Sequence, residues 1–259
     1  MLLAIDVGNT NICFGLFEGA NLVHHFRSAS SRTNTADEYL VFVRQTLALD
    51  GVDPSTVSAA IIASVVPTVT DTMVSMVRRA FALDPIVVGP STQTGMPILY
   101  DNPCDVGADR IVNAVAAYEV VRGGLIVVDF GTATTFDCVD PQGAFLGGAI
   151  VPGIQISADA LFSRAAKLAR VEVSIPPKVV GRNTPHAMQS GITFGYASLV
   201  DGLIARIRSE LEFPCTVWAT GGLATLIASL VTTIERVDEN LTFDGLRIVY
   251  ERHQASRAT

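Results

Sequence analysis

Lysine is scarce in this 259-residue chain, and the common glycine-rich nucleotide signatures are missing. The two lysines, Lys167 and Lys178, both lack the preceding glycine that a Walker A motif requires. No two glycines lie two positions apart, which excludes the G-x-G-x-x-G fingerprint of dinucleotide-binding folds. The motif set of protein kinases is absent as well. If the chain binds a nucleotide, other turns and side chains must contact the phosphates.

Charge and hydropathy exclude two further classes of protein. The formal net charge is −7 and the sequence contains no basic run, so we do not expect nucleic-acid binding. No apolar run approaches the roughly 18–20 residues of a membrane span. Residues 2–5 lead directly into Asp6, without the charged region or the cleavage site of a signal peptide. We therefore expect a cytoplasmic protein that associates with neither nucleic acid nor a membrane.

The sequence also lacks metal-binding clusters of cysteine and histidine. The four cysteines form no C-x-x-C pair, and no histidine is suitably spaced beside them. They are Cys13, Cys104, Cys138 and Cys215. We therefore expect no zinc site, and the thiols of a cytoplasmic protein should be reduced.

The most informative feature that is present is a repeated Asp-x-Gly turn. Residues 6–11 (DVGNTN) return in altered form as residues 129–134 (DFGTAT), and each copy follows an apolar run and precedes another strand-like segment. One such turn would be weak evidence, because Asp and Gly are common turn residues. Two facing turns would supply backbone N–H groups for phosphates and carboxylates, Asp6 and Asp129, for metal ions. The repeat predicts a duplicated, two-lobed phosphotransferase.

Local patterns predict the same three strands at the start of each half. The predicted strands span residues 2–7, 12–17 and 22–27, and again 125–130, 134–139 and 144–150. The first half continues with a helix over 34–49, a strand over 59–65, a helix over 68–81, a strand over 85–88, a long loop over 89–106 and a helix over 109–121. The second half continues with helices over 154–167, 187–211 and 222–232, a strand over 215–219 and a last helix from about 243, with a frayed tail over 254–259. This order predicts an α/β fold with a mixed sheet in each half.

Two local signals indicate where predicted helices begin and end. Thr35 and Glu38 are spaced as a capping box at the start of the first helix. Gly123 and Gly124 follow the helix that ends the first half, where glycines commonly terminate a helix. We therefore place the lobe boundary between residues 122 and 123.

Three further stretches of the sequence limit which ligands and which reaction the chain could support. Asp109 and Arg110 open a helix after the long loop; they suit a helix cap and a solvated charge, or a general base and a carboxylate clamp. Residues 147–153 (GGAIVPG) let backbone approach a ligand closely, or they form only a loop. Residues 219–224 (ATGGLA) follow a predicted strand and open a helix, where the glycines would let an adenine ring lie against the backbone.

Phosphate binding by hairpin turns is typical of the actin–hexokinase–Hsp70 superfamily, which the duplicated turn resembles. Over nearly its full length the chain resembles the type III pantothenate kinases, a family that also includes proteins labelled as Bvg accessory factor homologues. The resemblance rests on an ordered set of motifs: DVGNTN (6–11), Tyr100, GADR (107–110), DFGTATT (129–135), GGAIVPG (147–153), Asn183-Thr184 and ATGGLA (219–224). It implies two duplicated ribonuclease H-like, actin-like lobes, residues 1–122 and 123–259, each a mixed sheet flanked by helices.

The resemblance also implies an activity. Members of the family phosphorylate pantothenate to 4′-phosphopantothenate with ATP, the first step of coenzyme A biosynthesis. They use Mg²⁺ and require a monovalent cation, K⁺ or NH₄⁺. They are homodimers, and the pantothenate pocket includes surface from the partner subunit.

Residue roles are implied position by position. Asp109 would accept a proton, Asp6 would lie near Mg²⁺ through the phosphates, and Asp129 would bind the monovalent cation. ATP would be contacted by Asp6, Val7, Gly8, Asn9, Thr10, Asn11, Ile12, Cys13 and Thr132. Pantothenate would be contacted by Tyr100, Gly107, Ala108, Asp109, Arg110 and Thr184.

Two alternatives stay open. Another enzyme of the same superfamily, such as a small sugar kinase, an acetate kinase or an exopolyphosphatase, would use the same paired turns, although Arg110 beside Asp109 favours an acidic acceptor. A non-catalytic regulatory protein would keep the fold without turnover, although the presence of Asp6, Asp109 and Asp129 disfavours it.

Overall fold

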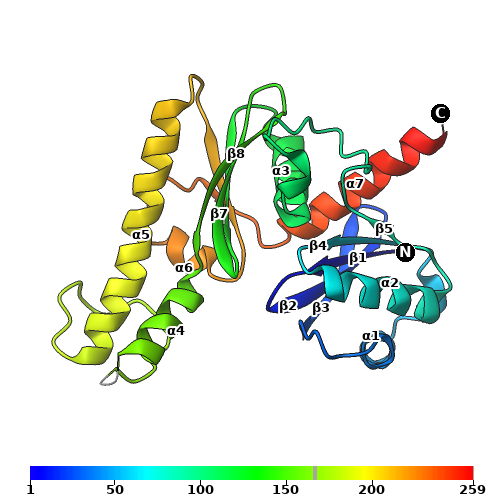
Figure 1. The fold of residues 1–259 in the computed structure, drawn as a ribbon, viewed down its shortest axis with the longest axis horizontal. Helices are drawn as coiled ribbons and strands as arrows, with labels where there is room; N and C mark the ends of the chain where they lie inside the picture. The colour runs from blue at the N-terminus through cyan, green and yellow to red at the C-terminus, as the bar shows by residue number, and fades with distance from the viewer. Residues whose placement is uncertain (166–167, 259) are drawn as a thin grey trace. The chain divides into compact units, whose positions relative to one another are not determined.

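The computed structural model describes residues 1–165 and 168–258, and the chain divides into two compact units (Figure 1). The first unit contains Met1–Met96, Tyr100–Ala116 and the segment from Leu241 on. The second contains Pro97–Leu99 and Ala117–Asn240, so the division falls within the helix α3 (Ala108–Val121).

The first unit is built on a five-stranded mixed sheet with the order β3-β2-β1-β4-β5. Its strands are β1 (Leu2–Val7), β2 (Asn11–Glu18), β3 (Asn21–Ala29), β4 (Ala59–Ser64) and β5 (Ile86–Val87). The first three strands run antiparallel in a meander, whereas β4 lies parallel to β1 and β5 parallel to β4. The predicted strands are confirmed, with small differences at their ends.

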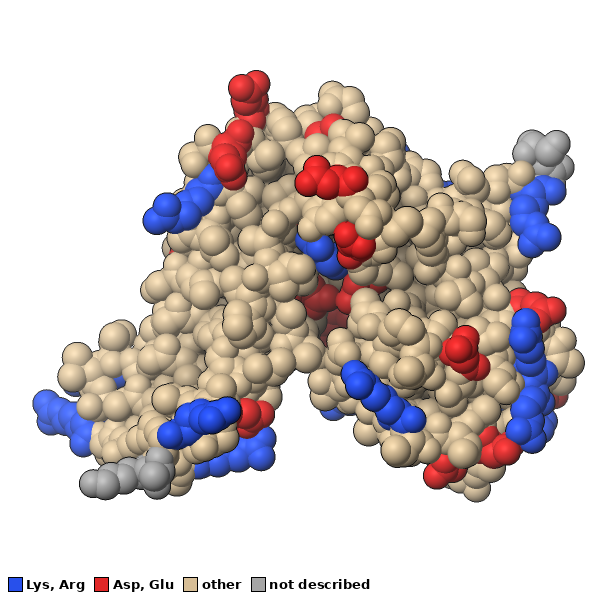
Figure 2. All heavy atoms as spheres, viewed as in Figure 1, with Lys and Arg blue, Asp and Glu red and all other residues tan. Residues whose placement is uncertain are grey.

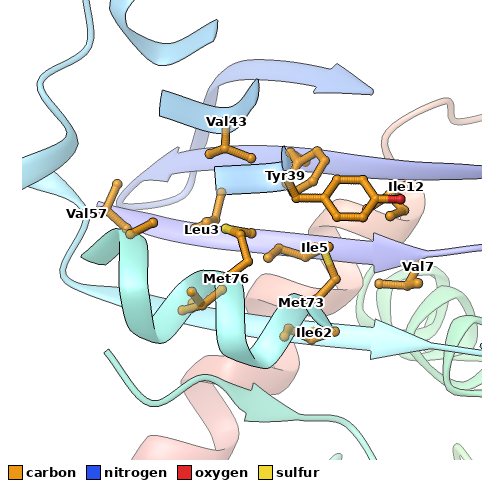
Figure 3. Close-up of a cluster of buried hydrophobic side chains, with 14 of the residues drawn as sticks. Leu3, Ile5, Val7, Ile12, Tyr39, Val43, Val57, Ile62, Met73 and Met76 are labelled. Atoms are coloured by element: carbon orange, nitrogen blue, oxygen red, sulfur yellow. The ribbon is translucent and has the colours of Figure 1, made fainter. Parts of the chain in front are cut away.

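Two helices, α1 (Ala36–Leu49) and α2 (Pro67–Phe81), cover one face of this sheet. Alternate residues of a strand point to the same face, so Leu3, Ile5 and Val7 of β1 all enter the core there (Figure 3). The predicted capping box is confirmed: the backbone N–H of Glu38 donates to Thr35 Oγ1, and the backbone N–H of Thr35 donates to the Glu38 carboxylate.

The helix α7 (Leu241–Ala258) belongs to the first unit, where it packs against β1 and β4. The sequence-based division had assigned these residues to the second lobe, because the apolar pattern of a helix does not reveal which sheet it covers. The predicted fraying over 254–258 is wrong, and Thr259 lies outside the described residues. The helix continues through Ala258, and its Arg252 side chain donates a hydrogen bond of 2.5 Å to the backbone carbonyl of Thr94.

The second unit repeats the architecture of the first. Its sheet has the order β10-β9-β6-β7-β8, and its strands are β6 (Leu125–Phe130), β7 (Ala133–Val139), β8 (Phe145–Pro152), β9 (Thr216–Thr220) and β10 (Arg236–Val237). The strands β6, β7 and β8 form the antiparallel meander, while β9 and β10 are parallel to β6. Each strand therefore has a counterpart at the same place in the first sheet, which confirms the predicted pair of duplicated mixed sheets.

Three helices pack on one face of the second sheet: α4 (Ile154–Arg164), α5 (Thr184–Glu210) and α6 (Ala224–Ala228). The helix predicted over 154–167 ends at Arg164, and residues 166–167 lie outside the described residues. The helix predicted over 222–232 is shorter than expected. Asp201 accepts hydrogen bonds from the Thr232 backbone and from the Thr233 hydroxyl, which fixes that segment in a non-helical conformation.

Two observations concern the expectation that the protein associates with neither a membrane nor nucleic acid. Within residues 1–165 and 168–258, no helix combines the length and the apolar character needed to cross a bilayer. On the face drawn in Figure 2, uncharged surface predominates, and Lys and Arg side chains lie at separate places rather than in one continuous area.

Candidate active site

The first repeated turn joins β1 to β2 in the first unit. The backbone N–H of Gly8 donates to the carbonyl of Asn11 over 3.0 Å and closes the turn. Asn9, Thr10 and Asn11 are exposed around it. Such a turn can present N–H donors and neutral side-chain donors to phosphate oxygens.

Asp6 lies across the hairpin from Cys13, its register partner on β2. Burial, with a smaller contribution from the negative charge of Asp6, raises the pKa of the Cys13 thiol to about 11, although the positive charge of Arg27 opposes the shift. Cys13 is therefore a neutral thiol near neutral pH, and the negative charge at this end of the hairpin comes from Asp6.

The predicted acceptor motif lies beside the end of β1. The backbone N–H of Val65 donates to the carbonyl of Val7 over 3.1 Å. Gly107 packs against Val65 so closely that an added Cβ would lie 3.3 Å from its Cγ1 atom. Within the first unit, the motif from Gly107 to Arg110 is thus brought to the same sheet edge as the turn after Val7.

Asp109 lies in the first turn of α3, which begins one residue earlier, so it is not the cap of this helix. Its carboxylate accepts a 2.8 Å hydrogen bond from the backbone N–H of Arg110 and lies close to Gly107. Burial raises the pKa of Asp109 above its ordinary value, and the N–H and positive charge of Arg110 oppose this only in part. A carboxylate in this environment is a candidate general base.

Arg110 and Tyr100 complete the part of the predicted acceptor site that lies in the first unit. Arg110 is 7% exposed, which excludes the solvated charge considered for it. Tyr100 is half-buried in the loop before η2 (Pro103–Asp105). A buried guanidinium beside a carboxylate can pair with an acidic ligand.

The second repeated turn, in the second unit, is one residue shorter than the first. Its closing hydrogen bond runs from the backbone N–H of Gly131 to the carbonyl of Ala133 over 3.1 Å. Thr132 is exposed at the tip, and its carbonyl accepts a 3.1 Å hydrogen bond from the backbone N–H of Gly153. The motif at 147–153 was expected to approach a ligand or to form only a loop; residues 147–152 instead belong to β8, and Gly153 lies against the backbone of the second turn.

Asp129 is surrounded by glycine. An added Cβ at Gly221 would lie 2.5 Å from the Asp129 carboxylate, and one at Gly131 would lie 3.6 Å from it. Gly221 also has a φ of +95°, which side-chain-bearing residues rarely adopt. The absence of side chains at these glycines lets the backbone approach the Asp129 carboxylate closely, and a carboxylate is a ligand that hard cations prefer.

No group of three or more His, Cys, Asp or Glu side chains suited to a metal ion occurs within residues 1–165 and 168–258. A cation at Asp6 or Asp129 must therefore obtain most of its ligands from backbone, water or a bound phosphate. Mg²⁺ in phosphoryl-transfer sites is usually bound in this way, through one or two carboxylates and the substrate phosphates.

Thr184 lines a different feature of the second unit, a groove of about 700 Å³ between α4, α5 and the segment before α5. It is the first residue of α5, after Asn183, whose side chain caps the helix by accepting a 2.9 Å hydrogen bond from the His186 backbone. Met188 and Ile192 contribute apolar lining. Asp129 and Thr132 are not among the residues that line this groove.

The sequence analysis did not single out Asp137, a carboxylate with no exposed surface on β7. It accepts a 3.0 Å hydrogen bond from Thr135 Oγ1, and Thr135 is the register partner of Asp129. The alternation of β7 was a usable signal, because residues 135 and 137 lie two positions apart and share a face.

Comparison with known proteins settles the family. Residues 2–206 match the family model described as type III pantothenate kinase. The chain belongs to the type III pantothenate kinase family. Type III pantothenate kinases from Myxococcus xanthus and Moorella thermoacetica are 56% and 53% identical to it, over 99% and 98% of this chain and 100% of each relative. The chain is therefore a kinase of this family.

Solved structures agree with a type III pantothenate kinase at the level of the fold. A Baf-family protein from Campylobacter jejuni aligns with a TM-score of 0.63 at 20% identity, covering 98% of this chain and 99% of that one. The ethanolamine utilization protein EutJ from Carboxydothermus hydrogenoformans aligns with a TM-score of 0.60 at 13% identity, covering 95% and 89%. At such identities the likeness concerns only the duplicated fold.

Proposed function

We propose that this chain transfers the γ-phosphoryl group of ATP to pantothenate, giving ADP and 4′-phosphopantothenate at the start of coenzyme A biosynthesis. The observation that carries the proposal is the partly buried Asp109, with its raised pKa, next to the buried Arg110 at the sheet edge where the first turn begins. Membership of the type III pantothenate kinase family supports the choice of acceptor.

In the proposed reaction, Asp109 accepts the proton of the primary hydroxyl of pantothenate. The hydroxyl oxygen forms a bond to the γ-phosphorus while the bond from phosphorus to the bridging oxygen of ADP breaks. Phosphoryl transfer passes through a loose transition state, so alignment of the two oxygens matters more than the strength of the base. The raised pKa of Asp109 still helps, because a base is most effective when its pKa approaches the working pH.

Arg110 is the proposed partner of the pantothenate carboxylate. A guanidinium can donate two parallel hydrogen bonds to a carboxylate, and its burial strengthens the interaction. The other proposed substrate contacts are Tyr100, Gly107, Ala108 and Thr184.

We propose ATP contacts for residues of each turn taken by itself: those from Asp6 to Cys13 in the first unit, and Thr132 in the second. Exposed Asn9 and Thr10 would donate to phosphate oxygens together with the backbone of the turn. Asp6 would hold Mg²⁺ through the phosphates, and Asp129 would hold K⁺ or NH₄⁺. When bound, these cations neutralise charge on the phosphate oxygens.

We further propose that the protein is a cytoplasmic homodimer, with a second copy seated on the groove that contains Thr184. Large apolar side chains are exposed on α4, on β8 and in the segment before α5: Ile150, Ile156, Leu161, Ile175, Val179 and Val180. Exposed apolar residues in such number on one part of a protein are typical of an interface. The apolar lining of the groove extends this surface.

The experiment that tests the proposal measures ADP release by the purified protein with Mg-ATP, K⁺ and pantothenate, and identifies the product by mass. Formation of 4′-phosphopantothenate that depends on pantothenate would support it. Acetate and glucose are the matched alternative acceptors, and turnover with one of them alone would identify another kinase of the superfamily. Release of phosphate from polyphosphate and water, without ATP, would identify an exopolyphosphatase. A folded protein without turnover on any acceptor would favour the regulatory alternative.

The same assay tests the cation site. Replacement of K⁺ by Na⁺ should reduce the rate sharply, because the two ions differ in radius and a site that holds K⁺ binds the smaller ion less well. Equal rates in the two salts would remove this role from Asp129.

A further inference from the structure

The helix α7 contacts α3 one helical turn after Asp109. Thr242 Oγ1 of α7 donates a 2.7 Å hydrogen bond to Asn113 Oδ1 of α3, and Asn113 has no exposed surface. Asn113 lies four residues after Asp109, and positions i and i+4 occupy the same face of a helix. The contact therefore lies directly behind the carboxylate on the same helix face.

A glycine brings the two backbones together at this point. An added Cβ at Gly245 of α7 would lie 2.0 Å from the carbonyl oxygen of Val112 and 2.5 Å from its carbonyl carbon. Backbone atoms cannot rotate away as the end of a side chain can. Any larger residue at 245 must therefore displace α3 or α7.

The same turn of α7 is also packed against the phosphate hairpin. The ring of Phe243 lies over Gly15 of β2, where an added Cβ would approach Phe243 Cδ1 to 2.7 Å. The register partner of Gly15 is Ala4 of β1, another small residue on this face. Three positions within one turn of α7 thus reach two different elements: Thr242 and Gly245 contact the helix that carries Asp109, and Phe243 contacts β2.

We propose that Thr242 and Gly245 are positioning residues for phosphoryl transfer, acting through α3. They set the distance between the turn after β1 and Asp109, and so align the attacking hydroxyl with the phosphate. This inference rests on the proposed function, because it gives Asp109 the role of general base. In this proposal α7 not only covers an apolar face of the first sheet but also holds α3 in position.

The first test compares Thr242→Val, which keeps the shape but removes the hydroxyl, with Thr242→Ser, which keeps the hydroxyl. We expect Thr242→Val to lower kcat about tenfold or more, since misplacement by about 1 Å can cost up to a hundredfold in rate. KM for ATP should stay within about twofold, because the turn itself is unchanged, and Thr242→Ser should restore most of kcat. Equal kcat values for Thr242→Val and the unmodified protein would overturn the proposal.

A double variant separates positioning from general damage. If Thr242 acts through Asp109, adding Thr242→Val to Asp109→Asn should lower kcat no further, because the base is already gone. A loss of the same factor in both backgrounds would show a merely structural role.

A glycine pair gives a matched control. Gly245→Ala should lower kcat more than Thr242→Val, whereas Gly202→Ala, in α5 with open space around its added Cβ, should leave kcat unchanged. If Gly245→Ala does not fold, Thr242→Val decides the question. A fully active Gly245→Ala enzyme would contradict the proposal.

Hydrogen exchange tests the contact between α7 and α3 without a measurement of enzyme activity. Thr242→Val should increase amide exchange at residues 108–113 of α3, and exchange in α5 serves as the internal control. Absence of pantothenate phosphorylation by the unmodified protein would overturn the proposed function alone. Unchanged exchange at residues 108–113 would overturn the coupling of α7 to α3 itself.

Discussion

The carboxylate of Asp109 accepts a 2.8 Å hydrogen bond from the backbone N–H of Arg110, the residue that also places a guanidinium beside it. Both effects favour the ionised carboxylate, yet burial outweighs them and the pKa of Asp109 is raised. Asp109 is therefore more basic than an exposed aspartate while still positioned by its neighbour.

Asp109→Asn should lower kcat by about 10²- to 10⁴-fold, the usual contribution of a general base. The fold should survive, because the amide has nearly the same shape as the carboxylate. Steady-state kinetics with circular dichroism would measure both quantities. Asp71→Asn, an exposed carboxylate on α2, is the control and should leave kcat unchanged. A fully active Asp109→Asn enzyme would remove the assignment of the base.

The pH dependence of kcat/KM should show the raised pKa. A general base works only when deprotonated, so activity should fall as pH drops through the pKa of Asp109. Since burial raises this pKa, the acidic limb should lie above the value near 3.9 of an exposed aspartate. A pH–rate profile of the unmodified protein measures the pH at which kcat/KM falls on the acidic side. If this fall is absent from the residual activity of Asp109→Asn, Asp109 is the group that titrates. A limb at or below the ordinary aspartate value would contradict the prediction.

The raised pKa of Asp109 also makes the stability of the fold depend on pH, in the direction opposite to that of a carboxylate whose pKa is lowered by folding. A raised pKa means that the folded state binds the proton more tightly than the unfolded state. Asp109 therefore favours folding at pH values below its unfolded pKa, and this contribution is lost as pH rises through the folded pKa. Asp109→Asn should thus raise Tm at pH 7, with a gain that shrinks at acidic pH. Thermal unfolding at both pH values measures it, and a lower Tm at pH 7 would be the contrary result.

The glycines around Asp129 predict a contrast between two neighbours. Gly221→Ala should destabilise the protein by about 1–3 kcal/mol, because its φ of +95° strains an L-residue and the added Cβ would meet Asp129 and Phe130. Gly222→Ala should change Tm little, since an added Cβ there has open space. Calorimetry of both variants makes the comparison. Equal melting temperatures would mean that the segment after β9 tolerates a side chain at Gly221.

The apolar surface beside the groove predicts the behaviour of charged variants in solution. Replacing Val180, which is 79% exposed, with glutamate should prevent dimerisation, because burying a carboxylate in an apolar interface is unfavourable. Light scattering after size exclusion should give a dimer for the unmodified protein and a monomer for Val180→Glu. Leu49→Glu, at an 87% exposed position at the end of α1, is the matched control and should stay dimeric. A dimeric Val180→Glu protein would move the proposed interface elsewhere.

The strands and most helix limits were predictable because their signals are local. The apolar run before each Asp-x-Gly turn, the capping box at Thr35 and the glycines after Val121 all lie within a few residues of what they determine. The motifs likewise predicted that Asp109 and Arg110 would open a helix, although the structure places Asp109 inside its first turn.

The remaining features depend on contacts between residues far apart in the sequence. No local pattern shows that α7 covers β1 rather than the second sheet, because both sheets offer an apolar face. The difference in length between the two turns and the burial of Asp137 depend in the same way on strand register. The roles of the site residues stay predictions, since geometry identifies suitable groups but chemistry must be measured.

The placement of α7 also bears on the order in which the chain acquires its structure during synthesis. The strands β1 and β4 are translated within the first quarter of the sequence, but the helix that covers one face of them consists of residues 241–258. The first sheet therefore cannot bury that face until nearly the whole polypeptide has left the ribosome. Unlike the usual sequence in which an N-terminal domain folds first, completion of the first unit here waits for the second to be translated.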